Sequence, residues 1–169
     1  MAVEEQTQYE DAGFIILSTT AYPRAGQRLT ISGRTVTKLG FWLRKYGTPA
    51  GSFYFATRKV SDDSIIVREL VATADSLTTT ISYVEHTFAS PPAVDEEVRI
   101  LVEYPFGDAA NMITTYRKLS DVKADEYSSY DHPPYFDDAG ADHAYKYTYE
   151  EPAAIVGGIN PALLELITP

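Results

Sequence analysis

The strongest constraint on the fold is a period-two alternation of apolar and polar residues between positions 29 and 104. Val, Ile, Thr, Tyr and Phe dominate this stretch, and Gly, Pro, Asp or Ser residues end each run. The runs cover residues 29–31, 36–46, 52–57, 83–88 and 98–104. Such alternation predicts half-buried strands, and the Gly and Pro clusters predict the turns between them. The stretch therefore predicts an antiparallel β-sandwich. Its expected core residues are Leu39, Phe41, Leu43, Phe53, Phe55, Ile100 and Val102.

The rest of the chain adds shorter elements around this stretch. Residues 14–17, 65–72, 112–117 and 144–149 predict further strands, and the last of these places Tyr145, Tyr147 and Tyr149 on one face. Residues 1–12 predict a solvated lead-in, and residues 120–140 predict a long surface loop. Asn160 and Pro161 are typical of the start of a short C-terminal helix. The expected organisation is an N-terminal lead-in with an apolar segment (1–24), a β-sandwich (25–150) and a C-terminal docking arm (151–169).

One series of motifs resembles a known family. It comprises residues 25–27, a hairpin over 36–53 with Gly47, Pro49 and Gly51, and the stretches 70–77, 83–91 and 97–104. This order is similar to the jelly-roll β-sandwich modules of choice-of-anchor surface proteins and, more loosely, to carbohydrate-binding modules. The resemblance covers roughly residues 25–150 and implies a jelly-roll fold without catalysis. Residues 60–64 replace the Gly-rich insertion of the family pattern, and the C-terminal tail is foreign to it.

Charge and composition exclude several classes of function. The formal net charge of −10 leaves no basic stripe for phosphates, so no nucleic-acid partner is expected. With no cysteine, the chain offers neither a disulfide framework nor thiolate chemistry. The start is acidic where a secretory signal is positively charged, and no run reaches membrane-spanning length. We therefore expect no membrane insertion and no signal peptide within these residues, either because the protein is not secreted or because a signal was removed before Met1.

The loop over 120–140 combines carboxylates with aromatic rings. Asp137, Asp138 and Asp142 are the closest acidic cluster, and carboxylate oxygens are the ligands that calcium prefers. A calcium site is possible there, although the spacing does not match the twelve-residue calcium loop and a solvated acidic loop is the simpler interpretation. Tyr127, Tyr130 and Tyr135 could stack on a sugar ring, or only hold the loop in place.

No motif in the chain predicts catalysis. His86, His132 and His143 lie on different predicted elements, without a His-x-x-x-His pair, a nucleophile elbow or a phosphate loop. Glu96 and Glu97 are adjacent strand residues, so their carboxylates point to opposite faces. We therefore expect a protein that is not an enzyme and needs no cofactor.

The C-terminal arm is the best indication of function. Its apolar side chains lie close together with one charged residue among them, and two turns of helix do not form alone in water. These predicted interface residues are Ile155, Val156, Ile159, Leu163, Leu164, Leu166 and Ile167. We expect a structural protein that assembles with copies of itself or other subunits in a virion, as a decoration or tail protein, or in an extracellular filament. The alternative is a carbohydrate-binding or adhesive module that uses the aromatic-acidic loop.

Overall fold

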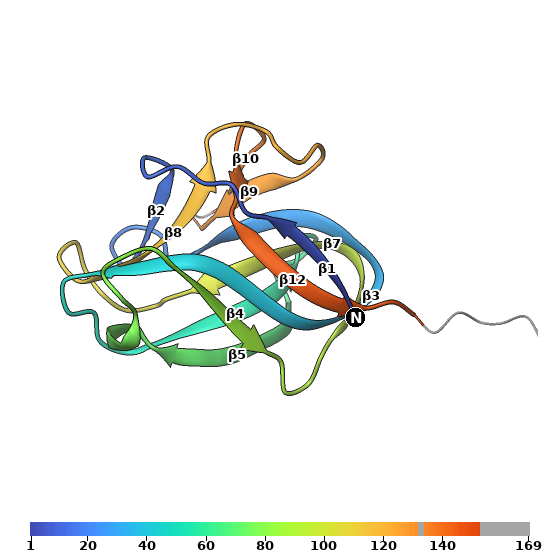
Figure 1. The fold of residues 1–169 in the computed structure, drawn as a ribbon, viewed down its shortest axis with the longest axis horizontal. Helices are drawn as coiled ribbons and strands as arrows, with labels where there is room; N and C mark the ends of the chain where they lie inside the picture. The colour runs from blue at the N-terminus through green and yellow to red at the C-terminus, as the bar shows by residue number, and fades with distance from the viewer. Residues whose placement is uncertain (132–133, 153–169) are drawn as a thin grey trace, which may run out of the picture.

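A computed structural model describes residues 1–131 and 134–152. This part of the chain is all-β, and its strands pair antiparallel (Figure 1). A single 3-10 turn, η1 (Ala74–Ser76), is the only helical element within these residues. The strands are β1 (Ala2–Gln6), β2 (Phe14–Leu17), β3 (Arg24–Tyr46), β4 (Ser52–Lys59), β5 (Ile65–Thr73), β6 (Ser82–Thr87), β7 (Ala93–Glu103), β8 (Met112–Lys118), β9 (Tyr127–Tyr130), β10 (Phe136–Asp138), β11 (Asp142–His143) and β12 (Tyr145–Glu150).

The 23-residue strand β3 connects two groups of strands. Its first half pairs with β9 and β7, and the order β10-β9-β3-β7-β4-β5 forms group A. Its second half pairs with β12 and β6 and, near its end, with β8, which also pairs with β2 and β11. Together with β1, which pairs with β12, these strands form group B. Figure 1 shows β4 and β5 of group A side by side, and β1 beside β12 of group B.

The buried core contains residues of both groups. Phe41 of β3 and Phe55 of β4 meet edge-to-face with ring centroids 5.2 Å apart. All seven core residues expected from the alternation are fully buried, which confirms that prediction. Tyr145, Tyr147 and Tyr149 are also buried on one face of β12, as expected. The strand predicted over residues 65–72 is present as β5.

Three local predictions were wrong. Ser32 and Gly33 do not separate two strands, because the chain continues through them as a bulge within β3. The start of the chain is not only a solvated lead-in, since β1 pairs with β12 from Ala2↔Tyr149 to Gln6↔Tyr145. Its acidic residues are compatible with a strand because basic side chains neutralise them, as in the ion pair between Glu4 and Lys123. The loop over 120–140 contains the paired strands β9 and β10, whose register depends on β3.

Candidate functional site

Two of the three predicted calcium ligands bind arginines. Asp137 accepts hydrogen bonds from Arg28 Nη1 at 2.8 Å and from Arg99 Nη2 at 3.0 Å. Asp138 accepts from Arg117 Nη1 at 2.9 Å. Burial raises the pKa of Asp137, but the hydrogen bonds from Arg99, Ser129 and Arg28 outweigh it, so the pKa lies below its ordinary value. The two carboxylates thus already have cationic partners.

The third predicted ligand, Asp142, is fully buried in a separate network. It accepts a hydrogen bond from Gln27 Nε2 at 2.5 Å and from the backbone N–H groups of Val122 and Lys123 at 2.7 and 2.9 Å. Among residues 1–131 and 134–152, no group of three or more His, Asp or Glu side chains is arranged to hold a metal ion. The arrangement of these carboxylates stabilises the loop, and calcium binding stays a prediction.

The arginine partners belong to a row that sequence reasoning missed. Arg28, Arg99 and Arg58 are register partners on β3, β7 and β4, so three like charges stand side by side. Like charges directly opposite one another destabilise a sheet unless they are neutralised. Asp137 bridges the first two arginines, and Glu103, which is 4% exposed, accepts from Arg58 Nε at 2.7 Å. The row is therefore an internally neutralised part of group A.

The predicted sugar-stacking residues are Tyr127, Tyr130 and Tyr135. The ring of Tyr135 lies between two guanidinium groups, at 4.9 Å from Arg24 and 4.2 Å from Arg99. The Tyr127 ring lies 5.0 Å from the guanidinium of Arg28, and Tyr130 packs edge-to-face on Tyr22 at 4.8 Å. These contacts tie the loop to the sheet. Sugar binding by these three tyrosines stays a prediction.

A serine–histidine pair is present but has no access to solvent. Ser128 Oγ lies 3.0 Å from Nδ1 of His143, and both residues are fully buried. Arg117 Nη1 donates to the same hydroxyl at 3.2 Å, so the hydroxyl proton is available to Nδ1. Burial, together with the neighbouring Arg117 charge, lowers the pKa of His143 to about 3. A nucleophile and base must reach a substrate, so this geometry favours a structural role.

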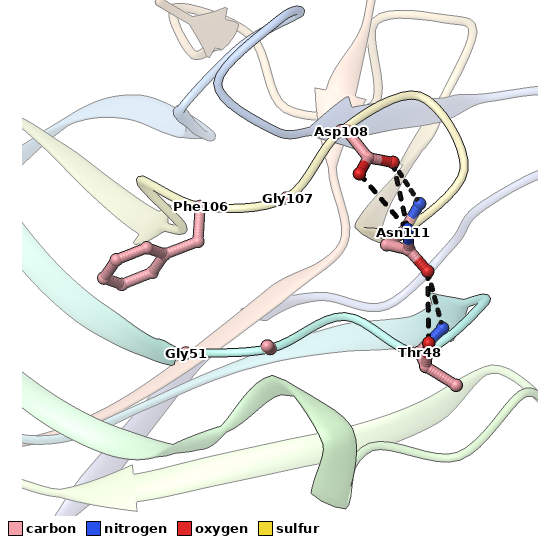
Figure 2. Close-up of a pocket in the computed structure, with 7 residues that line it drawn as sticks. Thr48, Gly51, Phe106, Gly107, Asp108 and Asn111 are labelled. Atoms are coloured by element: carbon pink, nitrogen blue, oxygen red, sulfur yellow. Dashed lines mark hydrogen bonds between the residues drawn. The ribbon is translucent and has the colours of Figure 1, made fainter.

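An open cavity of about 380 Å³ lies between the β3–β4 and β7–β8 loops (Figure 2). Asn111 connects the loops, because its side-chain oxygen accepts from the backbone N–H of Thr48 at 3.0 Å and its side-chain nitrogen donates to Asp108. The backbone N–H groups of Ala110 and Asn111 also donate to the Asp108 carboxylate. These hydrogen bonds hold the pKa of Asp108 below its usual value. The Phe106 ring borders the cavity, packs on the Gly51 backbone and is 43% exposed. The polar groups labelled in Figure 2 bind one another, which favours a loop-bracing role.

A second cleft, of about 210 Å³, lies over group B. Its walls are Trp42 of β3, Tyr83 of β6, Lys146 of β12, and Glu5 and Thr7 at the N-terminal strand. The sequence placed Trp42 in a strand but did not show that Tyr83 lies opposite it. Their pairing depends on the register Trp42↔Tyr83 between β3 and β6. We call this site the Trp42 cleft.

Strand β5 forms one end of group A. Within the part of the chain that the structure describes, β5 pairs with β4 alone. Ile65 and Leu70 are 52% and 54% exposed on it. Apart from Arg68 and Glu69, the residues of β5 are uncharged, and a strand with one free edge is a template for pairing with another chain.

The predicted interface residues between Ile155 and Ile167, and the predicted C-terminal helix, lie outside the described residues. Within residues 1–131 and 134–152, no helix is long and apolar enough to cross a membrane. No protein-family model matches the chain, and no curated protein is similar to it.

Proposed function

We propose that this protein is a non-catalytic structural subunit that assembles with further copies of itself through the free edge of β5 and its C-terminal arm. The observation that carries the proposal is β5, a nine-residue edge strand with Ile65 and Leu70 exposed. Natural proteins usually protect such an edge with charges, prolines or a covering segment. Pairing with a segment of a neighbouring copy satisfies the free backbone groups and buries both side chains.

The proposal includes a jelly-roll β-sandwich, as in the choice-of-anchor modules that the sequence resembles. Two observations support this fold: β3 takes part in both strand groups, and Phe41 and Phe55 pack between them. Strand β5 is at one end of group A, and among the described residues β6 pairs only with β3 in group B. The carboxylate of Glu69 on β5 lies 2.9 Å from Nε2 of His86 on β6, so these two edge strands are in contact. A sandwich explains why these two edge strands come so close.

The position of the last described residues supports a role for the arm. Glu150 of β12 pairs with Thr35, and Arg34 lies 3.9 Å from Glu151. The chain therefore continues past Pro152 from a fixed point beside the N-terminal strand (Figure 1). The apolar composition of residues 153–169 suits burial against a second copy. A virion decoration or tail layer, or an extracellular filament, is the setting that we propose.

The test is the oligomeric state in solution, measured by light scattering coupled to size exclusion. We expect the full chain to associate, and we expect Leu70→Lys and a deletion of residues 153–169 each to give folded monomers. Leu119→Lys is the matched control, because Leu119 is 47% exposed in the loop after β8, a strand that does not pair with β5. It should associate like the parent chain. A monomeric parent chain, or a Leu70→Lys variant that still associates, would overturn the proposal.

A further inference from the structure

The Trp42 cleft has a structural cause in the register of group B. Glu5, Lys146, Gly40 and Glu85 form one row across β1, β12, β3 and β6. Gly40 has no side chain, and the Tyr83 ring fills the space above it. A Cβ atom at this position would lie 2.4 Å from the hydroxyl oxygen of Tyr83. The Tyr83 ring therefore rests on the Gly40 backbone instead of projecting from the sheet.

Aromatic rings form one wall of the Trp42 cleft. The Trp42 and Tyr83 centroids are 4.8 Å apart at an interplanar angle of 48°, and the Tyr9 centroid lies 6.2 Å from that of Trp42. Tyr83 is 38% exposed. Tilted, partly exposed rings of this kind offer apolar faces to a ligand at little entropic cost, because tyrosine and tryptophan have few side-chain torsions.

The charges around the cleft neutralise one another. Glu5 lies 3.5 Å from Lys146, and Glu85 lies 2.9 Å from Lys38 while accepting from the Tyr83 hydroxyl. A charged ligand would have to break one of these pairs. A neutral ligand can instead use the hydrogen-bonding capacity that remains.

That remaining capacity includes donors and acceptors. Within residues 1–131 and 134–152, the indole N–H of Trp42 and the hydroxyl of Thr7 make no side-chain hydrogen bond, and the ion pair between Lys146 and Glu5 at 3.5 Å leaves further donors and acceptors on both groups. All four residues line the same cleft. A compact ring that carries hydroxyl groups on its rim and C–H bonds on its face matches this combination.

We propose that the Trp42 cleft binds one ring of a neutral oligosaccharide. The apolar face of the ring stacks on Trp42 and Tyr83, and its hydroxyls bond to Thr7, Glu5 and Lys146. The volume of about 210 Å³ suffices for a single ring, since an apolar cavity of about 150 Å³ holds benzene. The site is distinct from Tyr127, Tyr130 and Tyr135, and it does not depend on assembly through β5.

Trp42 makes this proposal directly testable, because it is the one tryptophan of the chain. Its fluorescence can be titrated with neutral oligosaccharides of glucose, mannose, galactose and N-acetylglucosamine at millimolar concentration. Choline and inorganic phosphate serve as charged probes. We expect a saturable change in Trp42 emission with at least one neutral sugar and none with the charged probes. No saturable change with any sugar, or a response to a charged probe alone, would contradict the proposal.

Variants connect the signal to the cleft. Tyr83→Ala should weaken sugar binding about tenfold or more by removing one stacking ring. Gly40→Ala should weaken sugar binding by a similar factor, because the added methyl group displaces the Tyr83 ring. Trp42→Ala has no tryptophan fluorescence, so its sugar binding is measured by calorimetry. Phe106→Ala, which alters the cavity between the loops, is the matched control and should bind like the parent chain. Equal affinity in Phe106→Ala, Tyr83→Ala and Trp42→Ala would place the sugar elsewhere and overturn the assignment.

Discussion

At the scale of single residues, His143 shows how burial determines ionisation. Its Nε2 atom is buried without a hydrogen-bond partner among the described residues, and Ser128 binds Nδ1. Arg117, which donates to Ser128, also disfavours a second positive charge nearby. The folded protein therefore holds the imidazole neutral. Near its ordinary pKa, this side chain takes up a proton only in the unfolded chain.

This residue predicts a pH dependence of stability. The pKa of His143 is about 3 in the folded protein and 6.5 in its ordinary environment, so the unfolded state binds one more proton between these values. The free energy of unfolding should therefore fall as the pH drops below about 6.5, by at most about 1.4 kcal/mol per pH unit from this group. Urea denaturation at pH 7.5, 6.5 and 5.5 measures the slope. His143→Gln should flatten it, and an unchanged slope would show that another group is responsible.

At the scale of elements, the bulge in β3 allows one strand to serve two groups. Ile31 pairs with Glu96 and Arg34 with Val94, so Ser32 and Gly33 together oppose the single residue Asp95. An extra residue bends a strand and increases its twist. Gly33 has a φ of +62°, the left-handed region that glycine adopts without steric penalty. The bend directs the second half of β3 into group B.

The stability of Gly33 variants should depend on how well the new residue tolerates a positive φ, and not on the room for its side chain. A Cβ atom there meets its nearest neighbour, Pro152, at an ordinary 3.5 Å. Gly33→Ala should lower the free energy of unfolding by about 1–2 kcal/mol through the left-handed φ alone. Gly33→Asn should cost less, because asparagine tolerates this region better, and Gly33→Val should cost most. Chemical denaturation of the three variants gives the order, and an alanine variant as stable as the parent would contradict the bulge.

At the scale of the whole molecule, one buried core joins residues of groups A and B. Phe41 is fully buried and meets Phe55 in that core. Phe41→Ala should lower the free energy of unfolding by about 3–5 kcal/mol, because it removes burial and leaves a cavity. Phe106→Ala is the exposed counterpart and should cost about 1 kcal/mol or less. Similar losses in the two variants would mean that the core lies elsewhere.

The sequence alone determined most of the central strands and the core, but not β1, β9 and β10. Alternation is a local property, and it predicted Phe41, Phe55 and Ile100 as buried residues, as well as the common face of Tyr145 and Tyr147. It was wrong at Ser32–Gly33, where local turn chemistry competes with strand pairing, and the bulge accommodates both.

Only the tertiary structure decided which side chains meet. Arg28 and Arg99 are 71 positions apart in the chain (99 − 28), yet they are register partners. Trp42 and Tyr83 likewise face each other only because β6 pairs with β3 in one register. A shift by one residue would send either partner to the opposite face of its strand. Register is set by the packing of the whole core, so the Trp42 cleft and the arginine row are not visible in any local pattern.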